Sequence, residues 1–190
     1  RTGKVESLLN GDSGAVFEKM EDVISHFKLP FYMRCTVDYY NEPVITMHLP
    51  DPSIIPAKLV HLTSAGNIDY EEKSSFQINK QYSEAIAGTA MNIAANLFAH
   101  IPTLNIIYIH GLFDKWQEEE YYFSLRITRQ QLIEATSCRT AFEAFNMVGA
   151  EHDLKTSGAF APIEPIFPDW WEKVPKEKIK SFKVACKAIY

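Results

Sequence analysis

The residues whose types and spacing best suit chemistry are Glu71 and Lys73, which form a Glu-x-Lys pattern. Three carboxylates precede it: Asp69, Asp51 and, further back, Asp38. In a metal-dependent nuclease, such carboxylates hold Mg²⁺ while the lysine stabilises charge on the phosphate. Residues of common types match this pattern often by chance, and no apolar run flanks them that would bury them in a central strand. The pattern therefore favours an exposed charged loop, and a Mg²⁺-dependent nuclease using Asp69, Glu71 and Lys73 is the alternative hypothesis.

Other signatures of catalysis are absent from the sequence. It has no G-x-S-x-G motif and no glycine-rich phosphate loop, and its eight glycines are scattered. None of the six histidines falls in an H-E-x-x-H motif, so a metal site would have to be assembled in space. His48 and His61 lie in strand-like runs and are the most interesting of the six. We expect no bound metal and no cofactor, and the balance is against an enzyme.

The strongest binding candidate is the basic C-terminal segment. Residues 172–190 hold six lysines against two glutamates, a balance of +4 that leaves −9 for the rest of a chain whose net charge is −5. Lysines there could contact phosphates, and two tryptophans could stack on bases or fill a partner's groove. The candidate binding residues are Lys176, Lys178, Lys180, Lys183, Trp170 and Trp171. A structural role explains them more simply, with the tryptophans anchoring the segment across the body and the lysines reaching into solvent.

The size and composition bound what kind of protein this is. A chain of 190 residues with 46% hydrophobic residues suits one domain with an ordinary core. Three separated cysteines without a C-x-x-C pair favour a reducing cytoplasm, and no apolar run is long enough to span a membrane. The chain begins with Arg1, which is typical of an excised segment. We expect a flexible lead-in over 1–11, one domain over 12–170 and a terminal helix over 171–190.

Hydrophobic periodicity predicts the elements that position these residues. Helical spacing predicts helices over 14–27, 75–100, a short stretch after Thr128, 140–147, and an amphipathic basic helix from Pro175. Period-two alternation predicts a hairpin of 31–39 with 44–49, a third strand over 58–63, and a second hairpin of 104–109 with 121–127. Polar loops are expected over 111–120 and 149–158, and an extended proline-rich segment over 159–166. Grouped strands and helices predict an α+β fold: a mainly antiparallel sheet of two hairpins plus an extra strand, a long central helix, and flanking helices on one side.

Several short motifs in this order resemble a known kind of domain. They are Asp38-Tyr39-Tyr40-Asn41-Glu42, Met47-His48-Leu49-Pro50, Tyr82 with Ile86, Ile106 to Gly111, Tyr122 to Leu125 with Arg129, and Ala161 to Pro165. The chain from about residue 38 to 166 is similar to a poorly characterised bacterial domain found beside Mrr-like restriction-endonuclease domains. The resemblance implies that nuclease chemistry belongs to a separate domain and carries no catalytic residue over. The matched residues look like turn and core determinants.

Three functional hypotheses follow. The first is a non-catalytic module of a bacterial cytoplasmic protein that binds protein or nucleic acid, with a link to defence against foreign DNA implied by the resemblance. The second is the Mg²⁺-dependent nuclease described above. The third is a dimerisation scaffold without a ligand.

Overall fold

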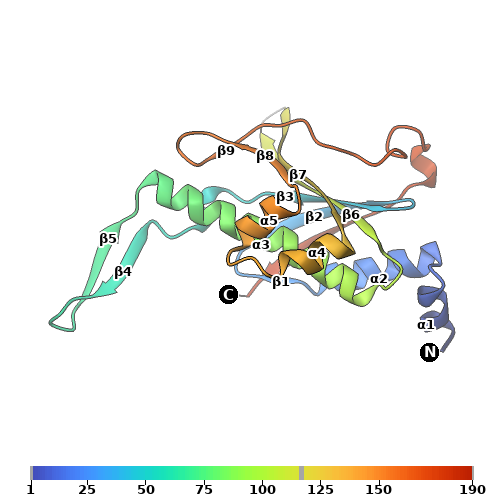
Figure 1. Cartoon of the computed structure of the whole chain (residues 1–190), viewed down its shortest axis with the longest axis horizontal. Coiled ribbons are helices and arrows are strands. Elements are labelled where there is room, and N and C mark those ends of the chain that lie inside the picture. The colour runs from blue at the N-terminus through green and yellow to red at the C-terminus, as the bar shows by residue number, and fades with distance from the viewer. Residues whose placement is uncertain (1, 116–117, 190) are drawn as a thin grey trace.

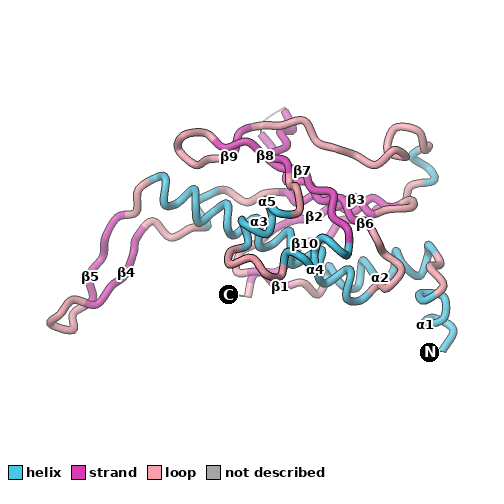
Figure 2. The backbone as a smooth tube through the Cα atoms, in the orientation of Figure 1, coloured by secondary structure: helices cyan, strands magenta, loops and turns pink. Residues whose placement is uncertain are grey.

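The computed structural model describes residues 2–115 and 118–189, and within them the chain has an α+β fold. A mixed eight-stranded sheet carries helices on one face, and a separate two-stranded sheet extends away from the body (Figure 1). Figure 2 shows the same division, with the helices gathered on one side of the strands. Within the described residues, no helix combines the length and hydropathy that a membrane crossing requires.

In the described residues there are five α-helices, and most of them begin at side chains that bind free backbone N–H groups. They are α1 (Thr2–Leu9), α2 (Ser13–Ser25), α3 (Ser75–His100), α4 (Arg129–Ala135) and α5 (Ala141–Met147), with short 3₁₀ turns η1 (Pro52–Ile54) and η2 (Lys176–Lys178). Asp12 caps α2, and Thr140 caps α5. Ser74 and Thr128 form reciprocal capping boxes with glutamines at the starts of α3 and α4.

The main sheet runs in the order β1-β10-β2-β3-β6-β7-β8-β9. Its strands are β1 (Lys28–Leu29), β2 (Met33–Tyr39), β3 (Pro43–His48), β6 (Ile106–Lys115), β7 (Glu118–Thr128), β8 (Glu151–Leu154), β9 (Phe160–Ala161) and β10 (Lys180–Ala188). Both predicted hairpins are present, as β2–β3 and β6–β7. The sheet is mainly but not purely antiparallel, because β3 pairs parallel with β6 and β1 with β10. The parallel β3–β6 pair requires a long crossover, and α3 lies within it.

The core lies between the helices and one face of the sheet, which we call the inner face. Alternate residues of β2, namely Met33, Cys35, Val37 and Tyr39, are buried there. Small side chains of α3, including Ala87, Ala90 and Ala94, are fully buried and let the helix backbone approach the strands. The predicted central core helix is therefore confirmed, with the bounds that its periodicity indicates.

The opposite, outer face of the sheet is partly covered by the C-terminal segment. Residues 162–174, which we call the strap, cross it between β9 and η2. Trp170 packs with Val44 and Tyr108 in a second, smaller apolar cluster, and Trp171 stacks on Phe167. The predicted anchoring role of the tryptophan pair is confirmed.

The prediction of a C-terminal helix from Pro175 is wrong. After the single turn η2, the chain forms strand β10, which lies between β1 and β2 and pairs with β2 over seven residues. The predicted domain boundary at residue 170 is therefore also wrong, because β10, which is paired with a strand on each side in the main sheet, follows it.

Other boundaries differ from the sequence prediction as well. Residues 2–9 of the expected lead-in form helix α1. Strands β6 and β7 continue into the expected loop over 111–120, of which Trp116 and Gln117 lie outside the described residues. Strand β8 occupies part of the expected loop over 149–158. The extra strand over 58–63 is β4 (Lys58–Leu62), which pairs with β5 (Ile68–Glu72) in the separate sheet instead of joining the main one.

Residues that carry the family resemblance hold the fold together. The Arg129 guanidinium donates hydrogen bonds to the carbonyls of Phe98, Ile101, Pro102 and Leu104, which satisfies the C-terminal end of α3. The buried Tyr82 hydroxyl donates to the Pro50 carbonyl at 2.7 Å. These contacts fit the expectation that the matched residues are turn and core determinants.

Candidate functional site

The predicted nuclease residues lie on the two-stranded sheet β4–β5, which we call the arm. Asp69 and Glu71 point to the same side of β5, and Asp69 lies 3.6 Å from the His61 imidazole across the strands. The Lys73 ammonium donates to the Gln81 side chain of α3 at 2.8 Å. Glu71 and Lys73 are thus not directed at a common point. Within residues 2–115 and 118–189, no three His, Cys, Asp or Glu side chains are grouped to hold a metal ion.

The arm has two chemically different faces. Strand pairing places Val60 opposite Tyr70 and Leu62 opposite Ile68, and these four side chains share one face by period-two alternation. They are between 61% and 72% exposed. The opposite face carries the His61–Asp69 pair. The sequence predicts a strand and a charged segment here, and only the pairing register shows that four apolar side chains gather on one uncovered face.

The predicted binding residues of the C-terminal segment do not form one surface. Trp170 belongs to the strap and is buried against Val44 and Tyr108 of the sheet, and Trp171 is half-buried against Phe167. Lys176 and Lys178 lie on η2, whereas Lys180 and Lys183 lie on β10. Of these six residues, Lys183 is the one that borders a hollow on the outer face.

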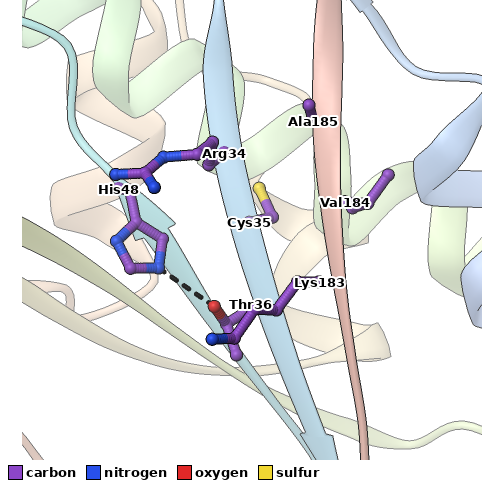
Figure 3. A pocket seen from close by; sticks show the side chains of 7 residues that line it. All are labelled: Arg34, Cys35, Thr36, His48, Lys183, Val184 and Ala185. Carbon is purple, nitrogen blue, oxygen red and sulfur yellow. Dashed lines mark hydrogen bonds between the residues drawn. The ribbon is translucent and has the colours of Figure 1, made fainter.

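That hollow has a volume of about 260 Å³ and is bordered by polar side chains from three neighbouring strands (Figure 3). Arg34 and Thr36 come from β2, His48 from β3 and Lys183 from β10. Pairing of Lys183 with Thr36 and of Arg34 with His48 sets these side chains side by side on the outer face. The sequence predicts that Arg34 and Thr36 share a face, but the contributions of β3 and β10 arise from pairing that periodicity cannot show.

A chain of hydrogen bonds links the side chains around this hollow. The His48 Nε2 atom lies 3.0 Å from the Thr36 hydroxyl, and Nδ1 lies 3.3 Å from a carboxylate oxygen of Asp114 on β6. Arg34 donates to the same Asp114 oxygen at 3.2 Å. Because an ionised carboxylate only accepts, Nδ1 of His48 carries a proton and, in the neutral ring, Nε2 accepts from Thr36. The order hydroxyl, imidazole, carboxylate matches that of hydrolase triads, but Asp114 is shared with Arg34 and Thr36 lies within a strand paired on both sides.

A second histidine on the outer face is buried beneath the strap. His110 Nδ1 lies 3.0 Å from the Ser124 hydroxyl, whose oxygen accepts the backbone N–H of Ile166 in the strap. The ring also packs edge-on against Tyr121 and Phe167. Burial lowers the pKa of His110 to about 4, so the ring is neutral near pH 7. His110 therefore fastens the strap to the sheet and has no access to a ligand.

Two of the three cysteines, far apart in the sequence, lie on the neighbouring strands β2 and β10 of the inner face. Cys35 and Cys186 are both buried and both free thiols. A hydrogen bond with the Cys186 thiol, together with burial, raises the pKa of Cys35. The same contact lowers the pKa of Cys186. Because both side chains are shut off from solvent, neither thiol can meet a substrate, and the pair serves packing.

No protein-family model, curated protein or solved structure matches this chain. Two surfaces of the molecule are candidates for binding: the apolar face of the arm and the hollow on the outer face.

Proposed function

We propose that this chain is a non-catalytic protein-binding module that self-associates through the apolar face of its arm. The observation that carries the proposal is the exposure of Val60, Leu62, Ile68 and Tyr70 on one side of a two-stranded sheet. Contiguous apolar patches on a surface mark interaction sites, and an isolated two-stranded hairpin is only marginally stable in water. A partner that covers this face would remedy both.

The charge of the arm favours a protein partner over a nucleic acid. Between residues 58 and 73 two lysines stand against three carboxylates, so the arm is slightly acidic. Phosphate backbones are bound by basic surfaces, whereas an uncharged apolar face suits another apolar face. The interaction therefore joins the protein-binding branch of the first hypothesis to the dimerisation of the third.

A second copy of the chain is the partner to which the proposal commits. The four apolar side chains carry no charge, and their two cross-strand pairs are alike in chemistry, so two such patches related by a twofold axis match each other. At the base of the arm, Lys58 and Glu72 form an ion pair at 3.5 Å. Each arm therefore presents both signs of charge there, so a second copy does not meet a surface of like charge. The arm extends away from the body, which leaves room for the second molecule (Figure 1).

The size of the arm sets the expected affinity. The two strands supply ten residues, whereas stable interfaces use about 20–30 residues on each side. We therefore expect a weak dimer that dissociates at concentrations on the order of micromolar. The link to defence against foreign DNA depends on the family resemblance alone and remains part of the proposal on that basis.

The test is the molar mass of the purified chain in solution over a wide concentration range. Sedimentation or light scattering should show a reversible change from 21.7 kDa to twice that mass. The double variant Leu62→Lys/Ile68→Glu should stay monomeric, because it places a favourable cross-strand charge pair where the apolar contact was. His61→Lys, on the opposite face of the same arm, is the matched control and should still dimerise. A monomeric wild type, or a double variant that dimerises equally well, would overturn the proposal.

A further inference from the structure

The hollow on the outer face is distinct from the arm, and its side chains point to a ligand of their own. Arg34, Thr36, His48 and Lys183 project to the same side of the sheet and surround it (Figure 3). On β10, Ala185 follows Lys183 on the same face, and its short side chain leaves the floor of the hollow open.

The local charge is positive in a chain whose net charge is −5. Arg34 and Lys183 bring two cations to the first hollow, and the carboxylate bonded to this cluster, Asp114, is engaged by Arg34 and His48. A second carboxylate, Asp51, borders the adjoining hollow. One guanidinium nitrogen of Arg34 makes the contact with Asp114, and a guanidinium has five N–H donors, so several remain for a ligand. In the described part of the chain, Lys183 forms no ion pair with a carboxylate. This arrangement favours an anion.

A second hollow of about 270 Å³ adjoins the first beyond Arg34 and His48, which border both. Its lining combines the aromatic and apolar side chains of Tyr32, Leu49, Pro50 and Phe113 with the carboxylates of Asp51 and Asp114. Ligand sites commonly combine a few polar groups that fix orientation with an apolar wall.

We propose that the two hollows together bind a small phosphomonoester. The phosphate would lie among Arg34, Lys183 and Thr36, and an apolar or aromatic remainder would lie in the adjoining hollow. Two cations match the two charges of a phosphate dianion, and an arginine fork with a lysine is a common way to hold its oxygens. When the His48 ring is protonated, the Thr36 hydroxyl between them can donate to a third oxygen of a tetrahedral anion.

Protonation of His48 should strengthen this binding. The neutral ring accepts the Thr36 hydroxyl proton at Nε2, so that proton is turned away from the ligand. A protonated ring donates from both nitrogens, which frees the hydroxyl to donate to the anion and adds a positive charge. The charged groups that face His48 are Arg34 on β2, Asp114 on β6 and Lys183 on β10, and Asp51 borders the adjoining hollow.

The test is a titration of the isotopically labelled full chain with sulfate, inorganic phosphate and phenyl phosphate, followed by NMR. Shifts should saturate and be confined to β2, β3 and β10 and to the adjoining residues around Phe113. Lys183→Gln and Arg34→Gln should each weaken binding by about tenfold, the scale of one lost hydrogen bond to a charged group. Thr36→Val should do the same under conditions in which His48 is protonated. Lys187→Gln is the matched control on the same face of β10 and should bind as the wild type does.

Two further comparisons decide the ligand class. Phenyl phosphate should bind more tightly than inorganic phosphate, and equal affinity would overturn the assignment of the adjoining hollow. Sulfate keeps its charge between about pH 5 and 8, so tighter sulfate binding at the lower pH, abolished by His48→Gln, would support the role of that histidine. Shifts that do not saturate, or that are equal in Lys183→Gln and the wild type, would overturn the site.

Discussion

In the β6–β7 hairpin Leu125 lies opposite Ile109, and in the arm Leu62 lies opposite Ile68. The first leucine is fully buried by helices of the same chain, whereas the second is 72% exposed. Both hairpins are antiparallel and carry β-branched or aromatic residues on one face, so the local sequence does not account for the difference. What differs is the cover: α3 and α5 pack on the body hairpin, and nothing in the described chain packs on the apolar face of the arm.

This difference explains why the arm carries the functional proposal. Apolar residues in the body are accounted for by folding, because each contributes about 25 cal/mol for every Å² removed from water. The same residues on the arm gain nothing of the kind within one molecule. A contact with a second molecule would remove these four side chains from water, and that would explain why they lie on one face of the arm.

The sharpest test of this comparison replaces the two leucines by alanine. Leu125→Ala should lower the free energy of unfolding by about 2–5 kcal/mol, because it leaves a cavity in the core. Leu62→Ala should change it by less than about 0.5 kcal/mol in dilute, monomeric protein. Urea unfolding of both variants measures the difference, and similar losses would show that the arm is covered by its own chain.

A second test compares how the buried His110 of the body and the exposed His61 of the arm affect stability as the pH changes. The folded pKa of His110 is about 4, below the ordinary value of 6.5, so the unfolded chain binds a proton in this window and the folded one does not. Stability should therefore fall as the pH drops from 6.5 to 4, by roughly 3 kcal/mol in total.

The measurement is urea unfolding at several pH values between these limits. His110→Gln should remove this part of the slope, and His61→Gln, on the exposed arm, should leave it unchanged. An unaltered slope in His110→Gln would show that the ring is not held neutral beneath the strap.

A third test uses the glycines of the two hairpins, which are needed for different reasons. A Cβ at Gly111 would lie 2.3 Å from the Phe123 ring, at the bulge between β6 and β7. Gly66 at the tip of the arm has φ of +79° and open space around it. Gly111→Ala should cost about 1–3 kcal/mol of global stability through overpacking.

Gly66→Ala should strain only the turn, so it should speed hydrogen exchange within the arm and leave the unfolding of the body unchanged. A loss of global stability equal to that of Gly111→Ala would mean that the arm and the body unfold together.

Much of the fold could be predicted because its signals are local. The capping Ser74, the small residues of α3 and the alternation of β2 and β3 specify those elements within short windows. The prediction for β10 failed because its sequence fits both the helical period and the period-two alternation of a strand. Phe182, Ala185 and Ile189 recur at helical spacing, while Phe182, Val184 and Cys186 alternate. Pairing with β2, about 150 residues earlier, selects the strand, and no local window contains that information.

The candidate site was harder to predict than the fold for the same reason. Lys183 was expected to bind a ligand, but on a helix with Lys178 and Lys180, and not beside Thr36. His48 stood out as a histidine in a strand, but its partner Asp114 was expected in a loop. A site made of a few residues from each of four strands exists only after the sheet is assembled.

The smallest expected effect concerns the junction between the arm and the body. The Tyr82 hydroxyl donates to the Pro50 carbonyl at 2.7 Å, where the chain leaves β3 and turns toward the arm. Ile54 and Ile55, further along this connector, also pack against the core. Tyr82→Phe should cost about 1 kcal/mol, the net contribution of one hydrogen bond, measured by urea unfolding. Tyr70→Phe on the exposed arm is the matched control and should cost nothing measurable.

Because the connector is held at more than one point, dimerisation should persist in Tyr82→Phe. Loss of dimerisation in this variant would show that this one hydrogen bond sets the orientation of the arm.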